Sequence, residues 1–263
     1  MSRRPMMAAN WKMNKTVMEA EAYTAALLPR AADADEVDVA VFVPFTCLYQ
    51  VSAMTQDTAV TAGAQNFYYE DSGAYTGEIS APMLLDVGAG AVLVGHSERR
   101  ETFGETDDTV AKKTRRAVEA GLIPIVCVGE TKEERDSGGM WDKVSGQVRR
   151  VIDELEDADG DSVVFAYEPI WAIGTGDTAT PEDAQEAIGK IRDLLREITG
   201  EDFADGVRIL YGGSVKPGNA AEIMAQDDVD GGLVGGASLD VESFVELVEA
   251  AQNAVAQTEQ TEE

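Results

Sequence analysis

The sequence predicts a single-domain α/β protein in which eight parallel strands alternate with helices and close into a (β/α)8 barrel. Short apolar runs recur eight times along the 263 residues, and longer amphipathic segments separate them. Several runs, such as Val39–Val43 and Val163–Ala166, are apolar at successive positions, as strands are when helices cover both faces of a parallel sheet. We find no linker or change of composition that would divide the chain.

The expected strands are short and apolar. In chain order they are Pro5–Asn10, Val37–Val43, Ala59–Ala64, Ala91–Gly95, Leu122–Val128, Val163–Glu168, Val207–Tyr211 and Asp230–Val234. A helical segment follows each strand, so closure into a barrel is the simplest arrangement of the repeated unit. We place the barrel at residues 1–256 and expect the polar segment QTEQTEE, residues 257–263, to be a frayed acidic tail.

Capping signals mark the starts of two helices. Thr180 precedes Pro181, and a threonine cap followed by proline at the first helical position is a typical helix start. The apolar residues that follow form one stripe with charges opposite: Ala184, Ala187, Ile188, Ile191, Leu194, Leu195 and Ile198. Thr131 and Glu134 have the spacing of a capping box for a second helix. The last helix shows apolar spacing at Val241, Phe244, Val245 and Val248.

Acidic residues dominate the polar composition. The chain has 49 Asp and Glu against 21 Lys and Arg, a formal net charge of −28, and the acids are scattered along it. Phosphate groups would be repelled, which argues against nucleic acid and anionic membranes as partners. Self-repulsion of this size destabilises a compact state unless salt screens it, so we hypothesise a halophilic surface suited to high ionic strength. The alternative is an ordinary acidic protein.

Few residues are available to bind a metal or to form disulfides. His96 is the only histidine, and Cys47 and Cys127 are far apart in apolar surroundings, so the sequence lacks a zinc site of standard spacing. We expect chemistry without a metal, and two buried thiols in a reducing cytoplasm. No apolar run reaches transmembrane length, and none follows Arg3 and Arg4 as a signal peptide would require.

Candidate catalytic residues occur at the C-terminal ends of the strands, where barrels of this kind carry their chemistry. The first expected strand ends at Asn10, and Lys12 lies two residues beyond it. His96 follows the fourth strand, and Glu168 ends the sixth. Each has an ordinary explanation as a packed histidine, a solvated lysine or a solvated strand-end carboxylate. Their occurrence at the same end of one barrel favours a shared site.

Two glycine-rich loops follow the last two strands. The first is YGGS from Tyr211, and the second is GGLVGGAS from Gly231 to Ser238. Glycine lets backbone N–H groups approach an anion closely, and barrel enzymes commonly bind phosphate in these two positions. Glycine pairs also occur in ordinary turns, so the prediction of a phosphate site depends on both loops together.

Four motifs occupy these strand ends: NWKMN from Asn10, GHSERR from Gly95, AYEPIWAIGTG from Ala166 and YGGS from Tyr211. In combination they resemble the triosephosphate isomerase family, in order and over nearly the whole chain. The resemblance implies a cofactor-free aldose–ketose isomerase of glycolysis and gluconeogenesis. Such an enzyme interconverts dihydroxyacetone phosphate and D-glyceraldehyde 3-phosphate through an enediolate.

The resemblance also implies roles for individual residues. Glu168 corresponds to the general base, and His96 to a neutral imidazole that polarises the substrate carbonyl. Lys12 corresponds to the cation that stabilises the enediolate, Asn10 to a substrate contact, and Glu98 to an acidic residue behind the site. The backbone donors to the phosphate correspond to Gly174, Ser214, Gly235 and Gly236.

The family resemblance assigns a mobile lid to the segment after the sixth strand. Its residues are Pro169, Ile170, Trp171, Ala172, Ile173, Gly174, Thr175 and Gly176. Closure would bring Ile173 beside Leu233 and remove water from Glu168, which raises the pKa of a carboxyl and strengthens it as a base. Tyr211 corresponds to the residue that holds the closed lid.

A long aromatic loop, Gln65–Glu78, resembles the segment through which two subunits of this family interdigitate. The resemblance places Thr76 near the tip of the loop, which enters the partner subunit beside Asn10 and Lys12, and so implies a homodimer. An ordinary surface loop that packs on its own barrel is the alternative.

Other functions fit parts of the pattern. A Schiff-base aldolase would need a lysine on an inner late strand, and none of the late strands carries one. A non-catalytic phosphate-binding or interaction protein on an inherited barrel would be expected to have lost Lys12, His96 or Glu168. All three are present.

Overall fold

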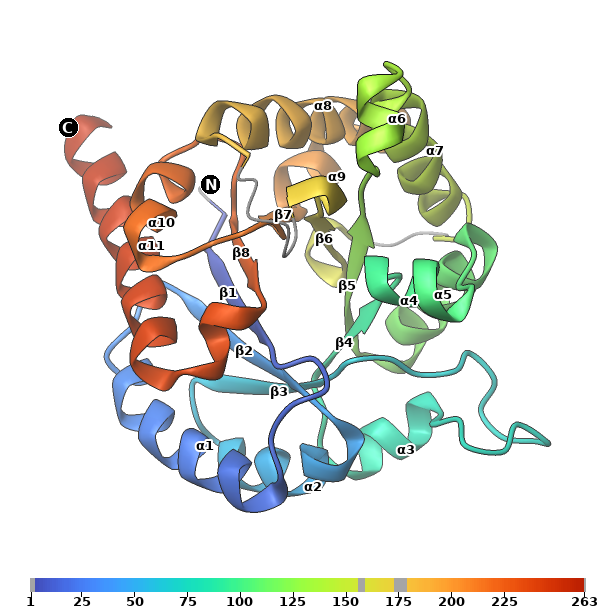
Figure 1. Ribbon diagram of the computed structural model, residues 1–263, viewed down its shortest axis with the longest axis vertical. Helices are drawn as coiled ribbons and strands as arrows, with labels where there is room; N and C mark the ends of the chain where they lie inside the picture. The colour runs from blue at the N-terminus through green and yellow to red at the C-terminus, as the bar shows by residue number, and fades with distance from the viewer. Residues whose placement is uncertain (1–2, 156–158, 173–178, 263) are drawn as a thin grey trace.

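A computed structural model shows a closed barrel of eight parallel strands surrounded by helices (Figure 1). The structure describes residues 3–155, 159–172 and 179–262, and for residues 257–262 the backbone alone. The strands pair in chain order from β1 to β8, and β8 pairs with β1 to close the sheet.

The strands confirm the expected fold, and each boundary lies within one residue of its prediction. They are β1 (Met6–Asn10), β2 (Asp38–Val43), β3 (Val60–Ala64), β4 (Ala91–Val94), β5 (Ile123–Val128), β6 (Val164–Tyr167), β7 (Arg208–Tyr211) and β8 (Gly231–Val234). Nearly all of their residues are buried, because one face packs into the barrel and the other against helices.

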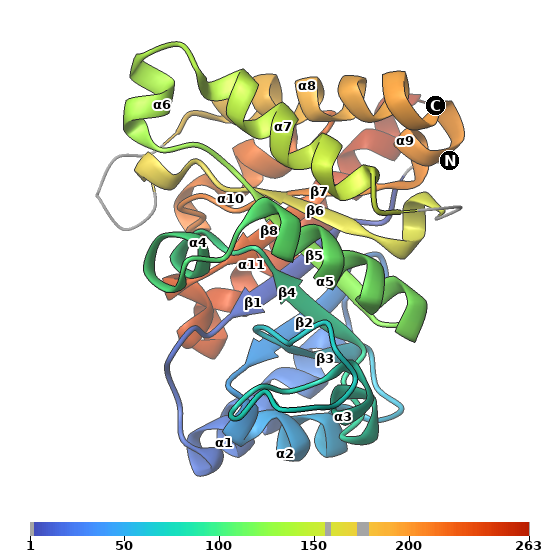
Figure 2. The ribbon, with the colours of Figure 1, turned by 90° about the vertical axis from the view of Figure 1, so that its right-hand side faces the viewer.

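Helices form the outer layer of the barrel (Figure 2). They are α1 (Val17–Ala31), α2 (Phe45–Thr55), α3 (Ala81–Asp86), α4 (Ser97–Phe103), α5 (Asp107–Ala120), α6 (Lys132–Asp136), α7 (Met140–Ile152), α8 (Pro181–Thr199), α9 (Glu201–Gly206), α10 (Pro217–Met224) and α11 (Val241–Glu262), with short 3₁₀ helices η1 (Gly160–Ser162), η2 (Ile170–Ala172) and η3 (Gly236–Leu239). None of the helices in the described ranges combines the length and apolar character that a membrane span requires.

The predicted helix caps are confirmed. Thr180 accepts a hydrogen bond from the Asp183 amide at the start of α8, and Thr131 accepts one from the Glu134 amide at the start of α6. Helix α11 continues to Glu262, into the segment for which the sequence predicts a frayed tail. The division of the chain at residue 256 remains a prediction.

The hydrophobic core has two parts, one inside the barrel and one between the sheet and the helices. Residues such as Phe42 and Leu210 fill the inside. Phe42 fits there because Gly63 on the neighbouring strand has no β-carbon, which would lie 2.4 Å from the Phe42 ring. Cys47 and Cys127 are buried free thiols, as the sequence predicts.

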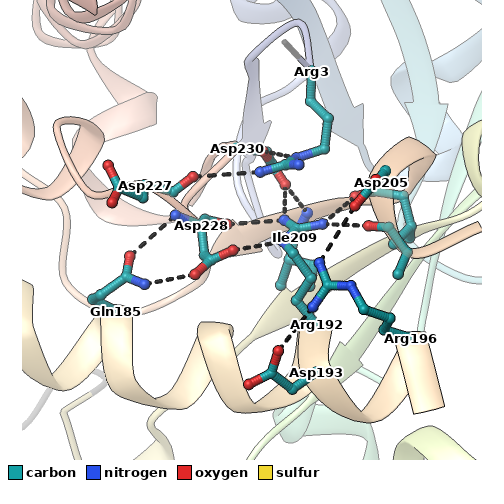
Figure 3. A network of polar contacts seen from close by, with 12 residues as sticks. Arg3, Gln185, Arg192, Asp193, Arg196, Asp205, Ile209, Asp227, Asp228 and Asp230 are labelled. Atoms are coloured by element: carbon teal, nitrogen blue, oxygen red, sulfur yellow. Dashed lines mark hydrogen bonds and ion pairs between the residues drawn. The ribbon is translucent and has the colours of Figure 1, made fainter. Parts of the chain in front are cut away.

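A buried polar network lies at the N-terminal ends of β7 and β8 (Figure 3). Arg192 of α8 donates from Nε to Asp228 Oδ1 at 2.8 Å and from Nη2 to Asp230 Oδ2 at 2.5 Å. Asp230 also accepts from the Ile209 amide at 2.7 Å and from Nε of Arg3 at 2.6 Å. The network ties α8 to the starts of β1, β7 and β8. At this end of such a barrel, polar networks serve stability rather than chemistry.

Candidate active site

A cavity of about 650 Å³ opens at the C-terminal ends of the strands. Its lining includes Asn10, Lys12, His96, Glu168, Ser214 and Gly235. These residues end or follow β1, β4, β6, β7 and β8, so strands that are distant in sequence contribute to one site. The structure thus brings together the residues that the sequence places at the strand ends.

Glu168 and His96 face each other inside this cavity. His96 Nε2 lies 3.0 Å from Glu168 Oε1, and the side chains are 7% and 3% exposed. The other carboxylate oxygen, Oε2, accepts the backbone N–H of Ser97 at 2.9 Å. Ser97 is the first residue of α4, so the carboxylate also lies at the positive end of a short helix. Two donors therefore hold the carboxylate of Glu168 against the end of β4.

A backbone contact determines which nitrogen of His96 carries the proton. The Glu98 amide donates to His96 Nδ1 at 3.2 Å, so Nδ1 acts as an acceptor. The proton of the neutral imidazole therefore resides on Nε2, where it points to Glu168. This is the tautomer that can donate a hydrogen bond into the cavity.

The pKa values of this pair depend on each other. Burial acts to raise the pKa of Glu168, but His96 and the Ser97 amide favour the carboxylate and the net shift is downward. Burial acts to lower the pKa of His96, but the Glu168 carboxylate outweighs it and the net shift is upward. The upward shift of the His96 pKa therefore exists only while Glu168 lies against the ring.

Lys12 lies on a strained backbone segment after β1. Its φ angle is 52°, in the left-handed region that residues with a β-carbon rarely adopt, which costs roughly 1–3 kcal/mol. Asn10 Oδ1 accepts the Lys12 amide at 3.0 Å, and Gln65 Nε2 donates to the Lys12 carbonyl at 2.9 Å. Glu98 Oε1 lies 2.7 Å from the Lys12 ammonium and holds that cation at the mouth of the cavity.

The two glycine-rich loops line the same cavity, next to Lys12. Ser214 follows β7, and Gly235 and Gly236 follow β8 and lead into η3. A β-carbon at Gly235 would lie 3.3 Å from Lys12 Cε, so glycine lets this backbone approach the lysine closely. Backbone amides beside a lysine are suited to an anionic group.

Comparison with known proteins agrees with this geometry. Residues 5–251 match a protein-family model described as triosephosphate isomerase. The triosephosphate isomerase of Rubrobacter xylanophilus is 74% identical over 251 residues, which cover 95% of this chain and 98% of that protein. The chain belongs to the triosephosphate isomerase family. The triosephosphate isomerases of Endomicrobium trichonymphae and Chloroflexus aurantiacus are 50% and 51% identical, over 94% and 93% of this chain and 98% of each relative.

The motifs that resemble triosephosphate isomerases lie around the cavity as far as the structure describes them. Leu233 and Gly236 line it, and Tyr211 is buried at the end of β7. Four of the predicted residues lie outside the described ranges: Ile173, Gly174, Thr175 and Gly176. The role of each predicted residue in the isomerisation remains a prediction.

The described half of the predicted lid segment, residues 169–172, contacts a buried carboxylate. Glu130, fully buried after β5, accepts at Oε1 from Trp171 Nε1 at 2.9 Å, from the Tyr167 hydroxyl at 3.1 Å and from Arg135 Nη1 at 3.2 Å. The Ile170 amide also donates to the Glu130 carbonyl at 3.1 Å. Glu130 is not among the residues predicted from the sequence. Its position two residues after the end of an apolar strand is the signal that could have identified it.

We expect Glu168 to stabilise the folded protein at neutral pH and to lose this contribution in acid. Its pKa in the folded chain is lowered from 4.5, so the contribution is present above about 4.5 and disappears as the pH falls through the folded-state value. The free energy of unfolding of the wild type should therefore fall relative to that of Glu168→Gln as the pH drops below about 4.5. Urea unfolding of both proteins measures this difference.

A matched control separates this effect from the general loss of negative charge in acid. Glu101→Gln makes the same change at an exposed position on α4. A difference between wild type and Glu168→Gln that stays constant over the acid range would show that the Glu168 carboxylate gains nothing from its partners.

Proposed function

We propose that the chain interconverts dihydroxyacetone phosphate and D-glyceraldehyde 3-phosphate, with Glu168 as general base, His96 as electrophile and Lys12 as the stabilising cation. The observation that carries this assignment is the direct contact of a buried carboxylate with a donating imidazole, beside a lysine and two glycine-rich loops. Membership of the triosephosphate isomerase family supports the reaction. The chemistry needs only proton transfers, which these side chains can supply.

The reaction begins when the substrate separates Glu168 from His96. The carboxylate takes a proton from the carbon next to the carbonyl, and the electron pair of that C–H bond forms the double bond of the enediolate. His96 donates its Nε2 proton to the carbonyl oxygen and recovers one from the hydroxyl on the carbon that lost its proton. Glu168 then returns its proton to the former carbonyl carbon, which completes the isomerisation.

Separation of the pair changes both pKa values in the direction that the chemistry needs. Away from the carboxylate, burial and the Lys12 charge lower the pKa of His96, outweigh the smaller opposite effect of Glu98 and so favour the neutral imidazole. Away from His96 and Ser97, Glu168 loses the two contacts that lower its pKa, and burial then raises the pKa against the smaller effect of the Lys12 charge. A carboxylate with a higher pKa is a stronger base.

The phosphate group and the lid complete the proposed site. The backbone amides of Ser214, Gly235 and Gly236 bind the phosphate together with that of Gly174. The lid, Pro169–Gly176, closes over the substrate with Ile173 beside Leu233 and excludes water, which limits loss of phosphate from the enediolate. Tyr211 holds the closed lid.

The decisive experiment is the turnover of dihydroxyacetone phosphate by the purified protein, from dilute buffer to about 1 M KCl. Turnover supports the isomerase. A protein that binds inorganic phosphate but shows no turnover at any salt concentration would instead be the non-catalytic phosphate-binding barrel.

We further propose a homodimer. Three side chains, Met13, Phe45 and Phe103, are exposed and line a second cavity of about 300 Å³ beside Lys12. Figure 1 shows the loop between β3 and α3, which carries Thr76, projecting beyond the barrel. An exposed apolar cavity and a projecting loop on one subunit are complementary features for a two-fold related copy.

We expect this dimer to depend on salt, because two subunits of net charge −28 must dock. Dilution in low ionic strength should release monomers with little activity, and about 1 M KCl should restore both dimer and turnover. Sedimentation velocity with parallel assays measures both. Phe103→Glu should weaken the dimer at every salt concentration, because it places a charge in the apolar contact. An association constant that does not change with salt would refute the prediction.

The acidic composition supports a proposed halophilic surface that works in a cytoplasm of high ionic strength. Unfolding midpoints should then rise from dilute buffer to about 1 M KCl, since salt screens the repulsion between carboxylates. Midpoints that stay level or fall would favour an ordinary acidic protein.

A further inference from the structure

Almost every cation of this acidic chain is paired with a carboxylate. The described ranges include all 21 Lys and Arg, and within them every arginine and most lysines form ion pairs. The lysines without a carboxylate partner in these ranges are Lys15, Lys112 and Lys216. Lys15 donates to the Leu239 carbonyl at 2.8 Å, and Lys112 lies over the Tyr69 ring. The Lys216 ammonium has neither kind of contact there.

Lys216 is exposed at the edge of the active-site cavity. It lies two residues after Ser214 and directly before α10, and it lines the same cavity as Glu168 and Gly235. Its backbone is fixed by Asn219, whose Oδ1 accepts the Lys216 amide at 2.8 Å and whose Nδ2 donates to the Ser214 carbonyl at 3.0 Å. The base of the side chain is therefore held beside the loop proposed to bind phosphate, while its charge is left free.

The cavity otherwise offers little uncompensated positive charge to an anionic substrate. Lys12 is offset by Glu98 at 2.7 Å, and Glu168 adds a further negative charge. A triose phosphate carries up to two negative charges near neutral pH and must approach a chain of net charge −28. We propose that Lys216 is a substrate-attracting residue that draws the phosphate dianion to this cavity and holds it at the Ser214 loop. This inference rests on the proposed function.

The test compares Lys216→Gln with Lys190→Gln. Lys190 is an exposed lysine of α8, paired with Glu186, so both variants change the net charge by the same amount. In dilute buffer, Lys216→Gln should lower kcat/KM by roughly threefold to tenfold with kcat nearly unchanged, and it should raise the inhibition constant of inorganic phosphate. At about 1 M KCl the loss should vanish, because salt screens an exposed charge. Lys216→Arg should behave as the wild type.

The outcomes separate this inference from the proposed function. Equal kcat/KM for the two glutamine variants in dilute buffer would overturn the role of Lys216 while leaving the isomerase intact. A loss that appears in kcat, or that does not change with salt, would overturn it as well, since it would indicate a structural effect. If the wild type is inactive, the proposed function fails. Binding of inorganic phosphate to the two variants, measured by calorimetry, then still decides the role of Lys216.

Discussion

Glu168→Gln should lower kcat by roughly 10²- to 10⁴-fold, the range that a positioned general base contributes. The variant keeps the shape of the side chain but removes the group that takes the proton. Binding of inorganic phosphate should be retained, because the glycine-rich loops do not depend on this carboxylate. Steady-state assays with dihydroxyacetone phosphate, with Glu101→Gln as the exposed control, measure the effect.

The hydrogen bonds of Glu168 predict a second property of this variant. Two donors, the Ser97 amide and His96 Nε2, face the two carboxylate oxygens, and glutamine can satisfy only one of them. The glutamine NH₂ group would require the other tautomer of His96, which the Glu98 amide opposes. We therefore expect a loss of roughly 1–3 kcal/mol of stability. A variant with wild-type kcat would assign the base to another residue.

Arg192→Met should lower the free energy of unfolding by about 3–5 kcal/mol, since it removes the buried cation that pairs with the buried Asp230 and the partly buried Asp228. Arg192 is 2% exposed, and Asp230, which it contacts, is 5% exposed. The arginine also donates from Nη1 to the carbonyls of Ala204 at 2.8 Å and Val207 at 2.9 Å. Methionine fills much of the volume but satisfies none of these acceptors. Urea unfolding at neutral pH measures the difference.

The matched control lies one turn further along the same helix. Arg196 is partly exposed and pairs with Asp193 and Asp205 near the surface (Figure 3), so Arg196→Met should cost only about 0–1 kcal/mol. Below its unfolding transition, Arg192→Met should keep the wild-type kcat, because its network lies at the N-terminal ends of the strands. Equal stability of the two methionine variants would mean that the buried network contributes no more than a surface pair.

The strands could be predicted closely because parallel strands covered on both faces are apolar without interruption. Val39–Val43 and Val163–Ala166 show this pattern, and helical segments separate the runs. The predicted site followed from the same topology, since the C-terminal ends of parallel strands converge. His96 and Glu168 are 72 positions apart in sequence numbering but lie in contact for this reason.

The contacts that hold the site in place could not be predicted in this way. Ser97 acts through its backbone amide, which has no signature in the sequence. Gln65 and Asn219 each make two hydrogen bonds, and the partners of these bonds are set by loop geometry. Packing decides whether a polar side chain lies in solvent, as most do, or against a strained backbone. The periodicity of the sequence does not indicate which of the two occurs.

Gln65 links the backbone of Lys12 to the loop that carries Thr76. Its amide holds the carbonyl of Lys12 and also donates to the Phe42 carbonyl at 3.0 Å, so a strained backbone is secured from the neighbouring strands. Gln65 is also the first residue of the loop that carries Thr76. A displacement of that loop would therefore shift Gln65 and, through its hydrogen bond, the backbone of Lys12. In the proposed dimer, subunit contact at this loop would act on the Lys12 backbone through the Gln65 amide, and a separated subunit would have a less constrained lysine.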